Sequence, residues 1–268
     1  MKSHTTLTNY ILLCLFAIGV NSISAQTDAK SKIIIDNMMS VTGNYDKLRA
    51  KKDVRFDYIY DNFAAGRDVS KEKLIFGGEQ SWASYSEHKR NVLPEQEGTV
   101  EQSLINGVPQ ITLNGKFVND PKALKGTVFI REVNTYWFSM IYKLQDNGTN
   151  YKYLGTEKVD GVEYDKIALT YDGAITKKEA DDEYILYFNP KTHLLDLFYF
   201  SLPAFGINDP IIKMTMSYEV IEGIYIPTVR KSYAPGKDGE YQINGEYTFK
   251  NIKFNNGYSS QDFVVKGN

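Results

Sequence analysis

The sequence predicts an α+β fold that is mostly antiparallel β, with one large curved sheet wrapped around helices. Three observations predict it. Apolar and polar residues alternate with a period of two over most of the chain. Two-residue turn signals recur between these stretches, and only two segments carry apolar residues at helical spacing. The 268 residues, with 20 Tyr and 14 Phe, are enough to bury a sizeable single core.

Residues 1–25 have the pattern of a signal peptide. Lys2 begins a short polar region, residues 10–20 are an uninterrupted apolar run, and small residues precede Ala25. We expect cleavage near Ala25 and export to the periplasm. The apolar run is shorter than the roughly 20 residues that a membrane span needs, so no span is expected.

The single cysteine, Cys14, lies inside this apolar run. Leu13 precedes it, where a bacterial lipoprotein signal has a small residue, so lipidation of Cys14 is the less favoured alternative. Cleavage would leave a chain without cysteine, which excludes disulfides and thiolate chemistry.

The first helix is expected over residues 28–42. Ile34, Ile35 and Met38 recur there at helical spacing, and Gly43 stands where a helix usually ends. From Lys52 the period changes to two, which predicts an antiparallel strand with one buried face. Further strands are expected at 72–76, 81–85 and 99–104, and Asn-Gly pairs at 106–107 and 114–115 predict hairpin turns.

A second helical region begins at Asp120-Pro121, a favourable N-cap followed by proline in the first turn. Gly126 is expected to interrupt this helix or to separate two short ones. A wide apolar stripe follows and ends before Asn147-Gly148. Because a large sheet must cover its apolar face, we expect residues 120–146 to form a helical lid over a pocket.

The second half of the chain again predicts strands, separated by turn pairs such as Asp160-Gly161, Glu222-Gly223 and Asn244-Gly245. About eleven strands are expected in all. No linker or repeat divides them, so residues 26–268 are expected to form one domain. The strands of this half are expected at 151–155, 162–171, 183–188, 194–202, 211–218, 225–233, 241–246 and 247–254.

Several segments resemble a group of exported Bacteroidota proteins of unknown function. They include residues 73–82 (KLIFGGEQSW), 134–140 (NTYWFSM), 186–190 (LYFNP) and 251–257 (NIKFNNG). That group is similar in architecture to the LolA/LolB periplasmic lipoprotein carriers. The resemblance implies an unclosed β-barrel that holds acyl chains beneath helical lids.

The residues favour a binding protein over an enzyme. His88 and His193 are expected in solvated loops, and neither has a second histidine or carboxylate at metal-ligand spacing. No nucleophile elbow or phosphate-binding glycine loop is present. No catalytic residue, metal or cofactor is therefore assigned, and a net charge of −2 argues against nucleic acid as a partner.

The expected function is non-enzymatic binding of a lipid, an acyl chain or another hydrophobic ligand, in lipoprotein or lipid trafficking. Alternatives are an envelope scaffold without ligand and a carboxylate-dependent hydrolase. The stripe after Gly126 could be core alone or core that also lines a pocket, and Phe205 could mark a pocket mouth or a peripheral membrane contact. The expected pocket residues are Phe56, Tyr58, Phe129, Tyr136, Trp137, Met140, Ile141, Phe198, Phe200, Met214 and Met216.

Overall fold

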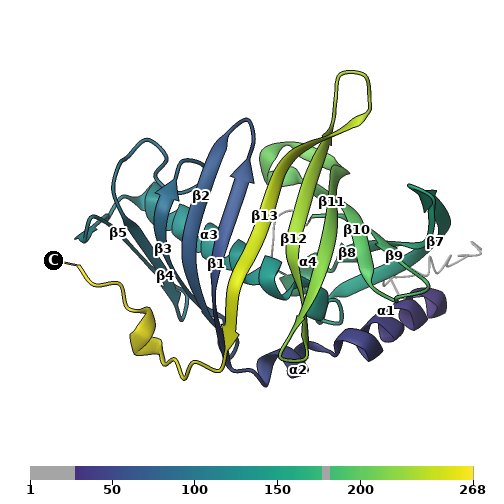
Figure 1. The fold of residues 1–268 in the computed structure, drawn as a ribbon, viewed down its shortest axis with the longest axis horizontal. Coiled ribbons are helices and arrows are strands. Elements are labelled where there is room, and N and C mark those ends of the chain that lie inside the picture. The colour runs from purple at the N-terminus through teal and green to yellow at the C-terminus, as the bar shows by residue number, and fades with distance from the viewer. Residues whose placement is uncertain (1–27, 177–181, 268) are drawn as a thin grey trace, which may run out of the picture.

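The computed structural model describes residues 28–176 and 182–267; the expected signal peptide and Cys14 lie outside this range. Among the described residues, thirteen strands form one antiparallel sheet that does not close (Figure 1). This confirms the predicted fold class. The strands are β1 (Asp53–Asn62), β2 (Gly66–Ile75), β3 (Gln80–His88), β4 (Val100–Ile105), β5 (Val108–Leu113), β6 (Lys116–Phe117), β7 (Thr149–Val159), β8 (Val162–Tyr171), β9 (Tyr184–Phe188), β10 (Leu195–Leu202), β11 (Ile207–Ile221), β12 (Ile224–Pro235) and β13 (Tyr241–Phe254).

Two sequential meanders make up the sheet, one of β1 to β6 and one of β7 to β13. They are joined at the centre, where β1 pairs with β13. The edge strands are therefore β6 and β7, which follow each other in sequence. The chain between them must cross from one end of the sheet to the other, and it does so as a helix.

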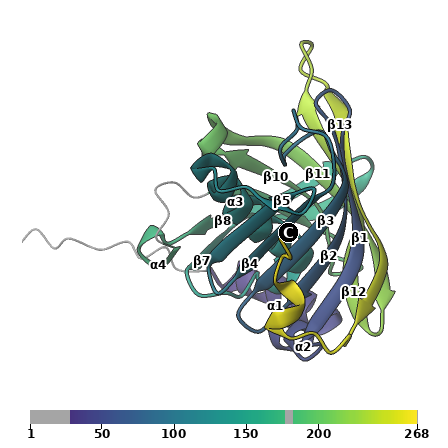
Figure 2. The ribbon, with the colours of Figure 1, turned by 90° about the vertical axis from the view of Figure 1, so that its left-hand side faces the viewer.

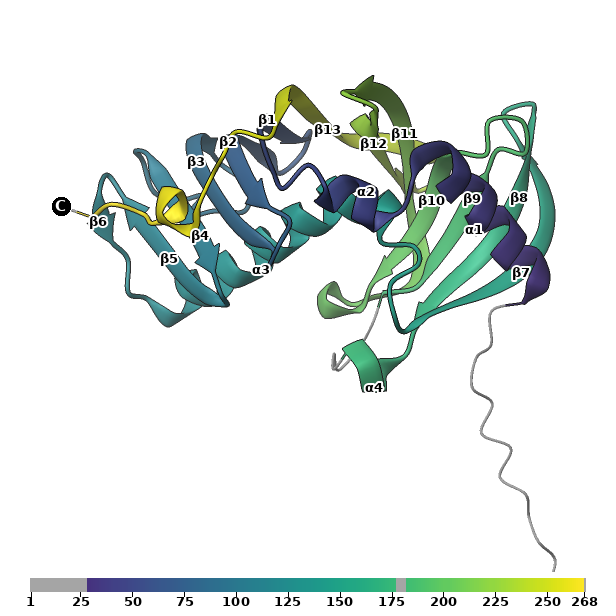
Figure 3. The same cartoon turned by 90° about the horizontal axis from the view of Figure 1, so that it is seen from below.

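The helices are few. They are α1 (Ala29–Thr42), α2 (Tyr45–Arg49), α3 (Pro121–Ser139) and α4 (Gly173–Thr176), with 3-10 turns η1 (Met140–Tyr142), η2 (Pro203–Phe205) and η3 (Ser260–Phe263). The sheet curves around α3, and α1 lies against β7 (Figures 2 and 3).

Helix α1 begins and ends as the sequence predicts. The Asp28 carboxylate caps it by accepting from the backbone N–H of Ser31 at 2.8 Å, and Gly43 ends it at φ +88°. The same carboxylate accepts from the backbone N–H of Tyr153 at 2.6 Å. Asp28 therefore ties α1 to the β7 edge and satisfies a donor there.

The expected interruption at Gly126 is wrong, because α3 runs unbroken for 19 residues. Asp120 caps it through the backbone N–H of Ala123, and Pro121 occupies the first turn. At 1.5 Å per residue the helix spans about 28 Å, which carries the chain over β3, β4 and β5. Compared with alanine, a glycine inside a helix lowers its stability by only about 1 kcal/mol. The other contacts of α3 contribute more than that.

One expected turn is also wrong. Asn244-Gly245 lies inside β13, where Gly245 pairs with both Asn62 and Ser232, so residues 241–254 form one strand and not two. After β13, the backbone N–H groups of residues 256, 257 and 258 donate to the buried carboxylate of Asp53.

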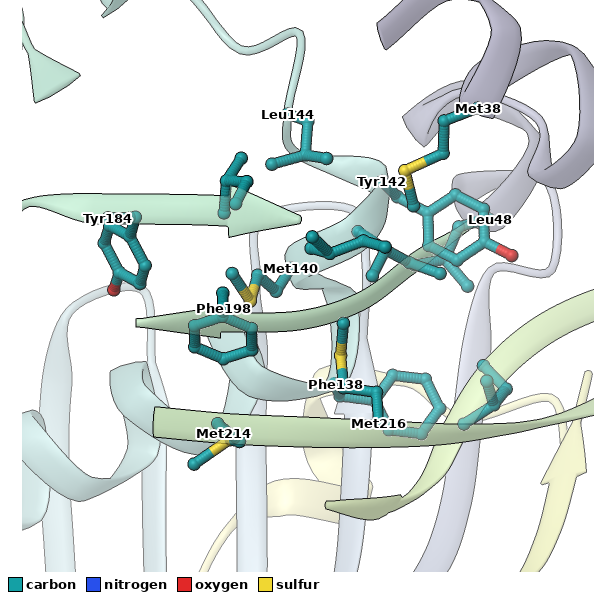
Figure 4. Packing of buried hydrophobic residues seen from close by; sticks show 14 of the residues in the cluster. Met38, Leu48, Phe138, Met140, Tyr142, Leu144, Tyr184, Phe198, Met214 and Met216 are labelled. Atoms are coloured by element: carbon teal, nitrogen blue, oxygen red, sulfur yellow. The ribbon is translucent and has the colours of Figure 1, made fainter. Parts of the chain in front are cut away.

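The main core lies on the concave side of the sheet, where aromatic and methionine side chains gather. Phe138 of α3 and Met140 of η1 are packed with Phe198, Met214 and Met216 from β10 and β11 (Figure 4). A second cluster lies between the first half of α3 and β3 to β5, built on Tyr85, Val100 and Ile111 among others. The first half of helix α3 thus packs in the second cluster, and its C-terminal end packs in the main core.

Candidate ligand-binding site

A groove of about 570 Å³ opens at the loop end of the sheet. Three segments form it: the connection between β3 and β4, the first half of α3, and η2 between β10 and β11. Its lining is mainly apolar, and polar groups such as Gln102 lie among the apolar ones. The apolar lining residues are Val92, Leu93, Pro94, Ile111, Ala123, Phe129 and Phe205.

The rim of the groove exposes two phenylalanines from opposite halves of the molecule. Phe129 of α3 is 43% exposed and Phe205 of η2 is 66% exposed, and their ring centroids lie 6.1 Å apart. They bring α3 and the β10–β11 connection together across the open side of the sheet. Large apolar groups exposed around a concave apolar surface are typical of a binding site.

The base of the groove is polar and fully hydrogen-bonded. Gln102 donates to Thr127 Oγ1 on α3 at 2.9 Å and accepts from the Tyr85 hydroxyl at 3.3 Å. Burial raises the pKa of Tyr85 well above its ordinary value, so this hydroxyl stays a donor at neutral pH.

Beneath this base lies a fully buried ion pair. Arg131 of α3 donates to Glu72 of β2 through both terminal nitrogens, and also to the Tyr85 hydroxyl. Ser70 and Asn134 donate to the remaining lone pairs of the carboxylate, at 2.7 Å and 3.2 Å. Burial disfavours the charge on Arg131, but Glu72 and Tyr85 outweigh it and raise the arginine pKa.

A second buried arginine has different surroundings. Arg230 of β12 is 1% exposed, and no carboxylate of the described chain forms an ion pair with it. Its guanidinium lies near the rings of Phe249, Trp137 and Tyr247, with the carbon atom 4.8, 5.1 and 5.5 Å from their centroids. Burial lowers the pKa of Arg230 from its ordinary value.

Of the expected pocket residues, only Phe129 lines the groove. Tyr136 and Trp137 are partly buried against the main core, where Trp137 stacks on Phe198 at 6.0 Å. The others are buried within the main core itself. These are Phe56, Tyr58, Met140, Ile141, Phe198, Phe200, Met214 and Met216. The structure brings these ten together around the second half of α3, apart from the groove, and their role in binding stays a prediction.

The expectation for His88 is wrong. It is buried at the end of β3, and its ring nitrogens lie 2.8 Å and 3.0 Å from the backbone oxygens of Val92 and Gly98. His88 therefore fixes the β3–β4 connection, one wall of the groove. His193 lies in a turn with φ +59°, beside a smaller pocket of about 200 Å³ shared with Lys30 and Asp165.

The β3–β4 connection is the part of the groove that sequence patterns did not identify. Asn91 to Gln96 has no periodicity and no turn pair. The available signal was Val92-Leu93-Pro94, an apolar group in a segment otherwise rich in charge.

Two other features are absent from the part of the chain that the structure describes. No group of three or more His, Cys, Asp or Glu side chains there is placed to hold a metal ion. No helix in that part of the chain is both long and apolar enough to cross a membrane.

Comparison with solved structures shows the fold. A DUF1329 family protein from Desulfovibrio piger is 13% identical at a TM-score of 0.51, with 87% of this chain and 96% of that chain covered. A LolA superfamily protein from Nitrosomonas europaea is 12% identical at a TM-score of 0.48, with the same two coverages.

Comparison with curated protein sequences gives no significant match. Comparison with descriptions of protein families gives one match. Residues 8–208, three quarters of the chain, match the description "Family of unknown function (DUF6503)". This confirms the expected membership of a family of unknown function, and the chain belongs to DUF6503.

Proposed function

We propose that the protein is a non-enzymatic, exported carrier that binds a lipid, an acyl chain or another hydrophobic ligand in the groove between α3, η2 and the β3–β4 connection. The observation that carries this proposal is the apolar groove with Phe129 and Phe205 exposed at its rim. Its volume of about 570 Å³ falls within the ~300–1,000 Å³ that small-molecule sites occupy.

Burial of apolar surface would supply the affinity. Each square ångström removed from water contributes about 25 cal/mol, before the costs of association are subtracted. The pattern of residues 1–25 supports export to the periplasm with cleavage near Ala25, and lipoprotein or lipid trafficking is the process that this ligand class suggests.

A neutral probe tests the groove. N-phenyl-1-naphthylamine fluoresces in apolar sites, and dodecanol should displace it from delipidated protein. The variants Phe129→Glu and Phe205→Glu place a charge on the rim, and each should weaken dodecanol binding by about tenfold, since a charge strongly opposes apolar burial.

Phe63→Glu is the matched control. Phe63 is 57% exposed at the β1–β2 turn, and it does not line the groove. It should leave binding unchanged. Absence of saturable binding, or an equal effect at Phe63, would contradict the proposal.

The alternative function is an envelope scaffold without ligand. It is favoured by the solid packing of the expected pocket residues, such as Phe198 and Met214, in the main core. A native organic extract analysed by mass spectrometry separates the two, because a carrier should retain a stoichiometric apolar molecule and a scaffold should not.

We further propose that α3 acts as the lid of this site. In the variant Trp82→Phe, Trp137 is the one remaining tryptophan of the two in the chain. Its emission should change when dodecanol is added, whereas Trp137→Phe should respond much less. An unchanged Trp137 signal under conditions where dodecanol binds would count against movement of α3.

A further inference from the structure

Arg230 is a buried cation that forms no ion pair with any carboxylate among residues 28–176 and 182–267. The other fully buried arginine, Arg131, has Glu72 as its partner, which is the usual arrangement because an uncompensated buried charge is costly. Arg230 donates only to the Trp137 carbonyl oxygen at 3.3 Å and to the Tyr58 hydroxyl at 3.4 Å, both long contacts. Its Nε, like that of Arg131, has no acceptor among the described residues, so the two arginines differ in the partners of their terminal nitrogens.

The aromatic rings around Arg230 compensate part of this cost. Cation–π contacts with Trp137, Tyr247 and Phe249 stabilise the charge. Rings act on the face of the guanidinium, however, and leave the N–H groups along its edge with weak or absent acceptors. A planar oxyanion that accepts two parallel hydrogen bonds matches such an edge.

A line of apolar side chains connects Arg230 with the groove. Phe129, Val133 and Trp137 stand four residues apart on α3, so they lie along one face of the helix. Phe129 is in the groove, and Trp137 is over Arg230. The eight residues from Phe129 to Trp137 rise by about 12 Å, a length that an acyl chain spans.

We propose that Arg230 recognises the oxyanion head group of a single-chain amphiphile whose tail runs along α3 into the groove. This inference rests on the proposed function. It assigns the ligand a negative charge and an orientation, in which the head group lies at Arg230 and the tail points to Phe205. Trp137 and Tyr247 are only partly buried, so rotation of the Trp137 side chain is the movement that admits the head group.

The first test compares head groups on one chain length. Displacement of N-phenyl-1-naphthylamine is measured with dodecanoate, dodecanol and dodecyltrimethylammonium, each below its micelle concentration. Dodecanoate should bind about tenfold more tightly than dodecanol, and the cationic amphiphile more weakly than either.

Arg230→Met should remove this preference, because it should weaken dodecanoate binding about tenfold more than dodecanol binding, so that the two affinities become equal. Arg230→Lys should keep part of the preference, because the charge remains but the paired donors do not. Arg67→Met is the control, since Arg67 is exposed on β2 and its loss should change neither affinity.

The second test needs no change at Arg230 and therefore stands even where Arg230→Met fails to fold. Bromine quenches tryptophan on contact, so two brominated dodecanoates are added to the variant Trp82→Phe. Bromine beside the carboxylate should quench Trp137 strongly, and bromine at the terminal methyl group should quench it little.

Equal binding of dodecanoate and dodecanol by the native chain would overturn the assignment of Arg230, as would stronger quenching by terminal bromine. In both cases dodecanol binding would still support the groove. If none of the three amphiphiles displaces the probe, the proposed function fails and the head-group assignment fails with it.

Discussion

At the scale of single residues, the ion pair between Arg131 and Glu72 shows how α3 is held to the sheet. Both side chains are fully buried, and every oxygen of the carboxylate has a donor. Such a pair contributes little net stability compared with apolar residues of the same size, but removal of one partner leaves a buried charge.

Glu72→Gln should therefore lower the free energy of unfolding by about 3–5 kcal/mol, as measured by urea denaturation. The double variant Glu72→Met with Arg131→Met should recover most of that loss, because no buried charge remains. A loss below about 1 kcal/mol for the single variant would show that water reaches Arg131.

This pair also marks a limit of sequence reasoning. The side of α3 that faces β2 to β4 carries Thr127, Arg131, Asn134 and Thr135, which in a sequence have the pattern of a solvent-exposed face. The partners of Arg131 and Asn134 come from strands 46 to 62 residues away, such as Glu72 and Ser81. No local pattern can reveal that polar groups from two distant segments satisfy each other.

At the scale of elements, Gly126 lies exposed within α3, and a methyl group added to it would meet no atom within 4 Å. Gly126→Ala should stabilise the protein by about 0.5–1 kcal/mol, because alanine loses less conformational entropy in a helix. The measurement is the midpoint of urea unfolding.

Gly245→Ala is a control that should change the stability in the opposite direction. Its methyl group would lie 2.8 Å from the backbone oxygen of Asp61, so β13 would have to move away from β1 and the unfolding midpoint should fall. If Gly126→Ala destabilised the protein as well, contacts across the groove, and not helix propensity, would dominate at that position.

The turns show which elements a sequence can locate. Asn106, Asn114, Asp160 and Glu222 all have positive φ at the predicted hairpins, where each is followed by glycine. Asn244 has the same neighbour but no positive φ. Pairing of Gly245 with strands on both sides decides its conformation, and that pairing depends on residues far along the chain.

At the scale of the whole molecule, one continuous sheet should unfold as one unit. We expect far-UV and near-UV circular dichroism to follow a single coincident transition in urea. Each half depends on the β1–β13 pair and on α3, which connects the two edges. Two separate transitions, one for residues before 148 and one for those after it, would contradict the single-domain prediction.

Alkaline pH should unfold the protein through its tyrosines. Burial raises the pKa of Tyr199 to about 12 and that of Tyr58 and Tyr184 further, whereas an unfolded tyrosine has a pKa near 10. The unfolded state then loses protons first, so stability is complete below about pH 10 and falls as pH rises above it. Tyrosinate absorbance should rise together with the loss of circular dichroism; a rise while the fold persists would contradict this.

The order of the strands is what the sequence did not predict. Alternation and turns predicted strands in both halves of the chain and a helical region between them. The pairing of β1 with β13 has no local signal, because 200 residues separate the partners Val54 and Phe254 along the chain. It follows only from the register of the complete sheet.

The pairing of β1 with β13 limits the order in which the sheet can fold. The strands up to β6 can pair with one another as soon as the first half of the chain is available, but the central pair must wait for β13, which follows the other twelve described strands along the chain. Until then β1 presents a ten-residue unpaired edge, which is open to association with other chains. The strand most open to association before the sheet is complete is therefore β1, although it lies at the centre of the finished sheet.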